Sequence, residues 1–400
     1  MSIHAPQRIL VAPSGFKESL DAAAVARAIA AGVRRVIPGV RVDEFPVPDG
    51  GEGTAAALAA STGGQLVPAT VTGPVGQPVA AYWARLGGAA SGTAVVEMAA
   101  AAGLRQVPRD RRDPSATTTR GVGELVAAAL DDGAERIVVG CGDSGTSDGG
   151  AGALAALGVR ILDRHGRDVR PGGGHLADAV ELDFTAAHPR LAEVDLVLAC
   201  NIHNVLCGPR GVARVFGPQK GATPDQVERL SAGLEVWAAL LHEQAPFGPE
   251  LDVRAGGGTG ASGGLGAGLA AAFGARLASR FDVLLDGGLL PHDLDGLIAA
   301  ADLVITAEGA IDFQTPRGKV PAEIARRARL AGVPVLGLAG SLGRGAPAVH
   351  DIGIDAIASI LTVPMPLEEA VEQGEELLRD AAERTMRLVL LGSAMSARAA

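Results

Sequence analysis

Short apolar runs alternate along the chain with segments of helical periodicity. The segment "RILVAPS" at 8–14 predicts a buried strand, and the alanine-rich segment 19–36 predicts a helix with Ser19 and Asp21 as caps. Residues 41–62 repeat this plan, with a glycine-rich turn, "PDGGEGT", before a helix that opens near Thr54. Strands that alternate with helices at this spacing indicate βαβ units and mostly parallel sheets.

The middle of the chain has a different pattern. From about Val71, the segment "VTGPVGQPVAAYWARLGG" combines turn signals with extended alternation, which predicts antiparallel strands. The last third returns to regular alternation, with the apolar runs "ADLVITAEG", "VPVLGLAGS" and "IDAIASILT". We therefore expect an α/β fold of two domains, in which 1–72 and 287–400 form a doubly wound parallel sheet and 73–286 form an inserted mixed α/β domain.

Composition narrows the class of protein. A chain of 400 residues with 48% hydrophobic and 20% charged residues supplies two buried cores. The net charge of −10 and the 3% aromatic content argue against a nucleic-acid partner. The apolar runs stop short of 18 residues and no signal peptide is evident, so we expect no membrane span. Three scattered cysteines, Cys141, Cys200 and Cys207, favour a reducing cytoplasm over a disulfide framework.

Polar, glycine-rich segments follow several predicted strands, where doubly wound sheets bind ligands. The stretch "ITAEGAIDFQTPRGK" (305–319) places two carboxylates, an amide, a hydroxyl and a lysine between glycines. Further glycine loops are "PDGGEGT" (48–54), "GDSGTSDGGAG" (142–152) and "GGGTGASGGLGAG" (256–268). Backbone N–H groups bind phosphate oxygens and carboxylates hold Mg²⁺, so these ingredients predict phosphoryl transfer.

Two other site types are disfavoured. Residues 140–145 form a G-x-G-x-x-G pattern after a strand, with Asp163 near the spacing of a ribose-binding acid. A dinucleotide is the runner-up on this ground, but Asp143 and Asp148 would repel a pyrophosphate and the loop runs on before any helix. Cys200, His203 and Cys207 have soft-metal spacing but no fourth ligand nearby, which argues against zinc.

Several motifs together resemble the bacterial type I glycerate kinase family over essentially the whole chain. They are, in the family's order, "APSGFKESL", "PDGGEGT", "VEMAAAAGL", "DSGTSDGGAGALAALG", "CNIHNVLCG", "VFGPQKGA", "GTGASGGLGAG" and "EGAIDFQTPRGKVP". The resemblance implies transfer of the γ-phosphoryl group of ATP, with Mg²⁺, to a hydroxyl of D-glycerate, giving 2-phosphoglycerate. It also implies that the discontinuous domain is flavodoxin-like.

We expect the following site residues. The catalytic residues are Asp312, as general base or orienting acid, with Lys17 and Lys319. The metal contacts are Glu308, Asp148 and Asp143. The substrate- or nucleotide-binding residues are Asp49, Gly50, Gly51, Glu52, Arg120, Ser144, Gly145, Asn201, Lys220, Gly257, Gly258, Gln314 and Thr315. The loops at 50–53, 142–150 and 257–264 would cradle nucleotide phosphates or shape the cleft.

The chain departs from the family's usual pattern at a few positions. Asn201 stands where the family commonly has an acid, Ala307 and Ala310 replace a glycine and a basic residue, and Asp143 adds an acid. One hypothesis is that Asp143 takes over the function lost at Asn201. The departures leave open a related small hydroxy acid as substrate, or a catalytically inactive homologue, and an NAD-dependent dehydrogenase remains the least favoured reading. The partners are small molecules, and the sequence is compatible with a homo-oligomer without determining one.

Overall fold

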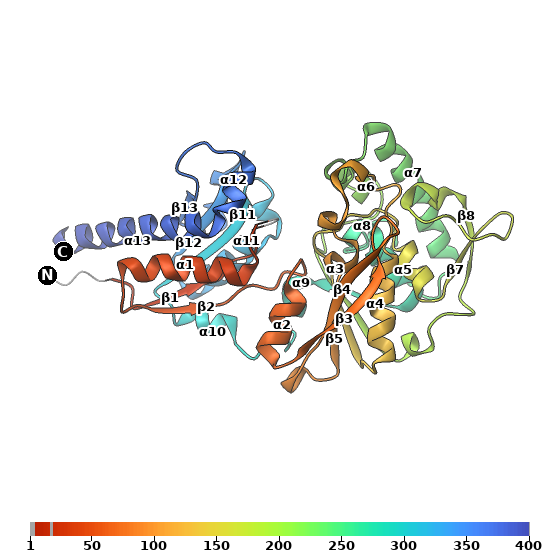
Figure 1. Cartoon of the computed structure of the whole chain (residues 1–400), viewed down its shortest axis with the longest axis horizontal. Coiled ribbons are helices and arrows are strands. Elements are labelled where there is room, and N and C mark those ends of the chain that lie inside the picture. Colours follow the sequence, from red (N-terminus) through yellow and green to blue (C-terminus); the bar gives the residue numbers. More distant parts are fainter. Residues whose placement is uncertain (1–4, 17–18, 400) are drawn as a thin grey trace. The chain divides into compact units, whose positions relative to one another are not determined.

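The structure is a computed structural model that describes residues 5–16 and 19–399. The chain divides into two compact units, Met1–Pro48 with His292–Ala400 (unit 1) and Asp49–Pro291 (unit 2) (Figure 1). The expected α/β class is confirmed. The expected first boundary at residue 72 falls instead inside unit 2, because β3 (Gln65–Thr72) pairs along its whole length with β4 (Pro78–Arg85).

Unit 1 is built on a five-stranded sheet in the order β13-β12-β11-β1-β2, with every neighbouring pair parallel. In chain order within the unit this is 2-1-3-4-5, the order of flavodoxin-like folds. The elements are β1 (Arg8–Val11), α1 (Ala22–Val36), β2 (Arg41–Glu44), α10 (Leu294–Ala299), β11 (Leu303–Ile311), η8 (Thr315–Arg317), α11 (Val320–Ala331), β12 (Val335–Leu342), η9 (Ala346–Val349), β13 (Ala356–Ser359), α12 (Leu367–Glu372) and α13 (Gly374–Ala399).

The core of unit 1 joins one face of this sheet to helices α1 and α13. Ile9, Val25 and Ile29 are fully buried in it together with Leu378 of α13. Helix α13 lies along α1 (Figure 1). Asp21 caps α1, as the sequence predicts, because its carboxylate accepts a hydrogen bond of 2.7 Å from the N–H of Ala24.

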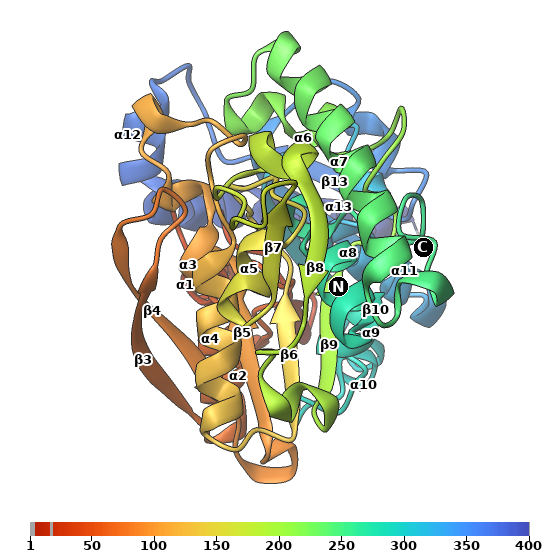
Figure 2. The ribbon, with the colours of Figure 1, turned by 90° about the vertical axis from the view of Figure 1, so that its right-hand side faces the viewer.

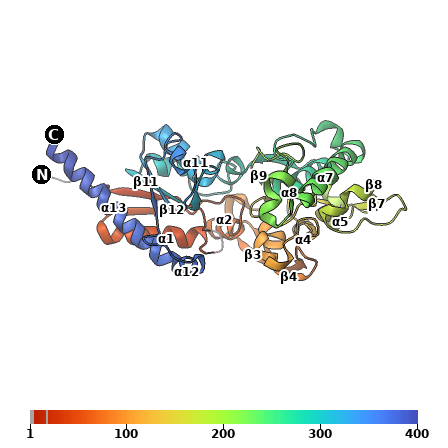
Figure 3. The ribbon, with the colours of Figure 1, turned by 90° about the horizontal axis from the view of Figure 1, so that it is seen from above.

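Unit 2 contains a six-stranded mixed sheet in the order β10-β9-β6-β5-β4-β3. Strands β5, β6, β9 and β10 are parallel, and β3, β4 and β5 are antiparallel, so the antiparallel character expected after Val71 is present. Figure 2 shows α4 over the strands of this sheet, and Figure 3 shows the small β7–β8 pair beside α5.

Both tryptophans of unit 2 are buried core residues: Trp83 lies in β4 and Trp237 in the helix Pro224–Gln244. The elements of this unit besides β3 and β4 have the following bounds. They are α2 (Thr54–Thr62), η1 (Gly88–Ala90), β5 (Thr93–Glu97), α3 (Met98–Ala102), η2 (Leu104–Gln106), η3 (Arg109–Arg111), α4 (Arg120–Asp131), β6 (Arg136–Gly140), α5 (Ala151–Ala156), β7 (Arg160–Asp163), η4 (Gly173–Asp178), β8 (Ala179–Asp183), η5 (Pro189–Ala192), β9 (Asp195–Cys200), α6 (Val212–Phe216), η6 (Pro218–Lys220), α7 (Pro224–Gln244), η7 (Gly248–Glu250), α8 (Ala261–Phe273), β10 (Arg276–Ser279) and α9 (Arg280–Leu284).

Among the helices of residues 5–16 and 19–399, none is both long enough and apolar enough to cross a membrane. The three cysteines are unpaired: Cys200 and Cys207 are buried and Cys141 is partly buried.

Substitution of Gly32 tests the packing of α1 on α13. A Cβ at Gly32 would overlap the carbonyl oxygen of Arg379 in α13. We expect Gly32→Ala to lower the free energy of unfolding by about 2 kcal/mol, since the overlap outweighs the gain in helix propensity. Thermal unfolding followed by circular dichroism measures the effect. Gly39→Ala is the matched control, because a Cβ there meets nothing within 4 Å, and equal melting temperatures for the two variants would contradict the packing argument.

Candidate active site

Two carboxylates and a lysine meet at the carboxyl end of β11 in unit 1. The Lys319 Nζ lies 3.0 Å from Glu308 Oε1 and 3.6 Å from Asp312 Oδ1, so the ammonium bridges the two acids. All three side chains are partly buried, which weakens the screening of their charges by water. We call Glu308, Asp312, Thr315 and Lys319 the β11 cluster.

The turn after β11 fixes this cluster through local hydrogen bonds. The buried Thr315 hydroxyl accepts a bond of 3.1 Å from the N–H of Asp312, and it lies 3.4 Å from Glu308 Oε2. The N–H of Gln314 donates to Asp312 Oδ1 at 2.8 Å. Gly318, with φ of +90°, then turns the chain into α11, and Lys319 stands at the N-cap of that helix.

The β11 cluster lies at the topological switch point of the unit 1 sheet. Strand β11 neighbours β1, and the chain order reverses between these two strands, which is where doubly wound sheets bind ligands. The loop after β1 contains Lys17, which lies outside the described residues. The arrangement around Asp312 can accept a proton or orient a hydroxyl, and Lys319 can hold an anionic oxygen.

In unit 2 the N–H groups of the glycine loop before α2 donate hydrogen bonds to carboxylates of the chain itself. The N–H of Gly51 donates to Asp49 Oδ1 at 2.9 Å, and that of Glu52 lies 3.4 Å from Asp143 Oδ2. Glu97 accepts bonds from the N–H groups of Gly53 (3.3 Å) and Ala55 (2.5 Å). Three carboxylates thus occupy the positions that a bound phosphate would take at this helix start.

Glu97 is a residue of this site that the sequence analysis did not single out. Glu97 is the last residue of β5 and is fully buried. It lies in the segment "VEMAAAAGL", and an acid within such an apolar run is the sequence feature that could have indicated a functional residue. Burial raises the pKa of Glu97 to about 7, while its two N–H donors act in the opposite direction. The carboxylate therefore titrates near neutral pH.

Asp49 and Asp143 flank the same glycine. A Cβ on Gly51 would lie 2.6 Å from Asp143 Oδ2 and 3.0 Å from Asp49 Oδ1, so only glycine leaves room for both carboxylates. Asp143 adopts the left-handed conformation, with φ of +52°, which costs a non-glycine residue conformational energy and is common at functional sites. Arg280 donates to the Asp49 carbonyl oxygen at 3.2 Å and holds this turn from the other side.

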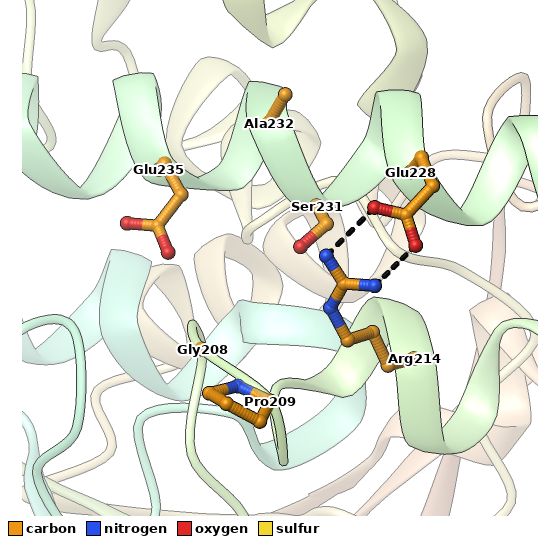
Figure 4. Close-up of a pocket in the computed structure, with 7 residues that line it drawn as sticks. All are labelled: Gly208, Pro209, Arg214, Glu228, Ser231, Ala232 and Glu235. Carbon is orange, nitrogen blue, oxygen red and sulfur yellow. Dashed lines mark hydrogen bonds and ion pairs between the residues drawn. The ribbon is translucent and has the colours of Figure 1, made fainter.

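Two of the cavities in unit 2 differ in their relation to the expected site residues. One, of about 210 Å³, lies beside Asp143 and is lined by Glu52, Tyr82, Glu97, Arg105 and Gln106 among others. The other, of about 440 Å³, lies between the loop after Cys207 and α7, where Arg214 pairs with Glu228 (Figure 4). The larger cavity contains none of the expected site residues, so its volume does not make it the candidate site.

Lys220 is almost completely buried at the end of η6 and holds the loop after β6. Its Nζ donates to Ser144 Oγ at 3.0 Å and to the carbonyl oxygen of Thr146 at 2.5 Å. Burial lowers the pKa of Lys220 to about 7, while the charge of Asp148 acts to raise it. Lys220 thus has a role inside the protein, and its direct contact with a ligand stays a prediction.

Comparison with known proteins identifies the family. The glycerate kinase family model matches residues 9–390. The glycerate kinase of Bacillus subtilis (strain 168) is 44% identical over 380 residues, which cover 95% of this chain and 96% of that protein. The glycerate 2-kinase of Escherichia coli (strain K12) is 42% identical over 363 residues, with 91% and 93% covered. The chain belongs to the glycerate kinase family.

A solved structure agrees with this assignment. The crystal structure of a candidate glycerate kinase 2 from Salmonella typhimurium LT2 superposes with a TM-score of 0.75 at 40% identity, covering 96% of this chain and 99% of that one. The expectation of an enzyme of the glycerate kinase family is thus confirmed. The dehydrogenase reading is not supported, since the N–H groups of Gly142 and Gly145 in its G-x-G-x-x-G loop donate to Gly50 and Ala102 carbonyl oxygens.

In this member of the glycerate kinase family, Asp148 is better placed as a capping residue than as a metal contact. It is 1% exposed. Its two oxygens accept bonds from the Thr119 N–H and hydroxyl, at 2.8 and 2.9 Å, and from the N–H groups of Gly150 and Gly152, each at 3.2 Å. These bonds tie the starts of α4 and α5 together and leave no oxygen directed to solvent.

Other expected ligand contacts also have partners within unit 2. Arg120 pairs with Glu124 at 3.1 Å on α4. The side-chain oxygen of Asn201 accepts from the N–H of His203 at 3.0 Å. In the loop before α8, the N–H of Gly258 donates to the Asn204 carbonyl oxygen at 3.1 Å, whereas Gly257 is exposed. This loop therefore packs against 201–206, and only its outer part faces solvent.

The expected metal contacts do not form one group. Among the described residues, no three His, Cys, Asp or Glu side chains lie close enough together to hold a metal ion. Asp49 with Asp143 in unit 2 and Glu308 with Asp312 in unit 1 are pairs of partly buried carboxylates. Two carboxylates are the usual protein contribution to a magnesium site that is completed by water and phosphate oxygens.

The titration of Glu97 gives a stability prediction. Its folded-state pKa of about 7 exceeds its ordinary value of 4.5, so the stability it contributes is complete below pH 4.5 and lost as pH rises through 7. We expect the difference in unfolding free energy between the wild type and Glu97→Gln to fall by about 3 kcal/mol over this window. Urea unfolding at several pH values measures it.

Glu243→Gln removes one negative charge from an exposed position in the same unit and is the control. A wild-type minus Glu97→Gln difference that stays constant with pH, or that rises, would contradict the assignment of Glu97.

Proposed function

We propose that this protein transfers the γ-phosphoryl group of ATP, as its magnesium complex, to the 2-hydroxyl of D-glycerate, giving 2-phosphoglycerate and ADP. The observation that carries the proposal is the β11 cluster at the switch point of unit 1, in a chain whose relatives include proteins named glycerate kinase and glycerate 2-kinase. Related small hydroxy acids are the second candidate acceptors, since Asn201, Ala307 and Ala310 depart from the family's usual residues.

The residues of the β11 cluster have distinct roles in this reaction. The hydroxyl oxygen of the acceptor forms a bond to the γ-phosphorus, the bond from that phosphorus to the ADP oxygen breaks, and the hydroxyl proton passes to Asp312. Lys319 provides positive charge for the phosphoryl oxygens, and Glu308 holds Lys319 in place. The hydrogen bond from Gln314 fixes the orientation of the Asp312 carboxylate.

Magnesium fits the carboxylates of the chain. When bound, Mg²⁺ would supply positive charge that neutralises the phosphate groups. In unit 2 the partly exposed pair Asp49 and Asp143 would hold such an ion. In unit 1, taken by itself, Glu308 would be the carboxylate that holds one. Asp143 therefore remains a candidate for the function that Asn201 lacks.

The partners in this proposal are the small molecules ATP and D-glycerate. The net charge of −10 disfavours a nucleic acid, and the unpaired cysteines fit a reducing cytoplasm. A homo-oligomer is compatible with the sequence.

The proposed function is tested by direct assay. Purified protein is incubated with Mg-ATP and D-glycerate, ADP release is followed, and the phosphorylated product is identified by NMR. We expect 2-phosphoglycerate. Formation of 3-phosphoglycerate would contradict the position of transfer, and turnover with another hydroxy acid alone would contradict the substrate. Binding of both substrates without turnover of any hydroxy acid would identify an inactive homologue.

Substitution of Asp312 tests the proton acceptor. Asp312→Asn keeps the size of the side chain and removes its basicity, so we expect kcat to fall by about 100-fold or more with little change in the KM of either substrate. Steady-state kinetics measures this. Glu372→Gln, at an exposed acid of α12 in the same unit, is the control. A fall in kcat of less than threefold in Asp312→Asn would rule out the proposed role.

A further inference from the structure

Lys220 is almost completely buried, and its ammonium bonds to the loop where ligands are expected. It is 2% exposed, and two of its three N–H groups donate to Ser144 and Thr146, which lie just beyond the carboxyl end of β6. This edge of a parallel sheet is where ligands bind in α/β proteins. A buried ammonium is costly unless it is hydrogen-bonded, and these bonds offset part of that cost.

The direction of the bond between Lys220 and Ser144 follows from chemistry. An ammonium has three donors and no acceptor, so the Ser144 oxygen must accept. The Ser144 hydrogen then points away from Lys220. Within the described part of the chain no side chain or carbonyl accepts it, and Ser144 is partly exposed. The hydroxyl is therefore a donor directed outward from the loop.

Hydrogen bonds to neighbouring segments hold the loop around Ser144 and so preserve the direction of its hydroxyl. The N–H of Gly142 donates to the Gly50 carbonyl oxygen at 2.8 Å, and that of Gly145 to the Ala102 carbonyl oxygen at 2.9 Å. The Thr117 hydroxyl bonds the Gly145 carbonyl oxygen at 3.0 Å. Ser144 thus lies between two anchored glycines, and its side chain has one orientation set by Lys220.

We infer that Lys220 is a positioning residue that fixes the Ser144 hydroxyl as a donor to an anionic oxygen of the substrate, in unit 2. The inference rests on the proposed function and adds to it a specific contact. The oxygen belongs either to the carboxylate of the hydroxy acid or to a phosphate of the nucleotide. Both are oxyanions, and a neutral hydroxyl beside the negative Asp143 can donate a hydrogen bond to either of them without carrying a charge itself.

The protonation of Lys220 provides a readout that a purely structural role would not change. A neutral amine can accept the Ser144 hydrogen, so the outward donor is lost when Lys220 loses its proton. The charged groups around Lys220 are Asp148, in the loop after β6 that also contains Ser144, and Arg112, whose side chain lies against Gly221. With a pKa of about 7 for Lys220, the KM of the substrate bound by Ser144 should rise with pH through neutrality.

The experiment compares Ser144→Ala, Lys220→Met and the double variant by steady-state kinetics with D-glycerate and Mg-ATP varied separately. We expect Ser144→Ala to raise the KM of one substrate by about 10- to 100-fold, with kcat changed less. Lys220→Met should raise the same KM, and the double variant should be no worse than Ser144→Ala alone. The substrate whose KM rises identifies the oxyanion. Ser231→Ala, a buried serine of α7, is the matched control.

Three results would overturn the inference: unchanged KM values in Ser144→Ala, effects of the two substitutions that multiply in full, or a KM that rises with pH equally in the wild type and Ser144→Ala. The last comparison decides the question even when Lys220→Met fails to fold. Calorimetric binding of each substrate separates this inference from the proposed function. Absence of glycerate turnover in the wild type rejects the function, while affinities for D-glycerate and for Mg-ATP that are both unaffected by Ser144→Ala reject the contact.

Discussion

Backbone lies directly against backbone where the glycine loops of unit 2 meet, and this contact sets the arrangement of the site. A Cβ at Gly263 would overlap the carbonyl oxygen of Thr146, and one at Gly264 would lie 2.7 Å from the Cα of Gly149. The loop after β6 and the start of α8 are thus in contact without side chains between them. Trp237 completes the contact by donating to the Gly149 carbonyl oxygen at 2.9 Å.

Such close packing buries polar backbone, which then needs partners inside the protein. Lys220 supplies a donor for the Thr146 carbonyl oxygen, and Asp148 accepts the N–H groups at the starts of two helices. These buried charges therefore hold the shape of the loop. Thr146 and Ser147 carry buried hydroxyls without a hydrogen-bond partner among the described residues, a cost that this packing imposes.

The alternation of apolar runs and helical segments was sufficient to predict the fold class, because buried parallel strands read as continuous apolar runs in any sequence. The β11 cluster could also be predicted from the sequence, since Glu308, Asp312 and Lys319 lie within twelve residues of one another and one turn brings them together. The roles of Lys220 and Asp148 could not be predicted from the sequence. A charged residue beside glycines gives the same sequence pattern whether its side chain faces solvent or is buried. Lys220 is buried, and its partner Ser144 is more than seventy residues away in the sequence.

The position of Glu97 has a consequence for how unit 2 can recognise phosphate. A helix start preceded by glycines ordinarily offers N–H groups to an anion, but at α2 those of Gly51, Gly53 and Ala55 already donate to Asp49 and Glu97. Asp49 and Asp143 are partly exposed there. Under the proposed function, their charges would repel a bare phosphate and attract one that carries magnesium. Neutral donors such as the Ser144 hydroxyl would then recognise the anionic oxygens. In this proposal, the chain's own acids would favour a nucleotide that arrives as its metal complex over one that arrives free.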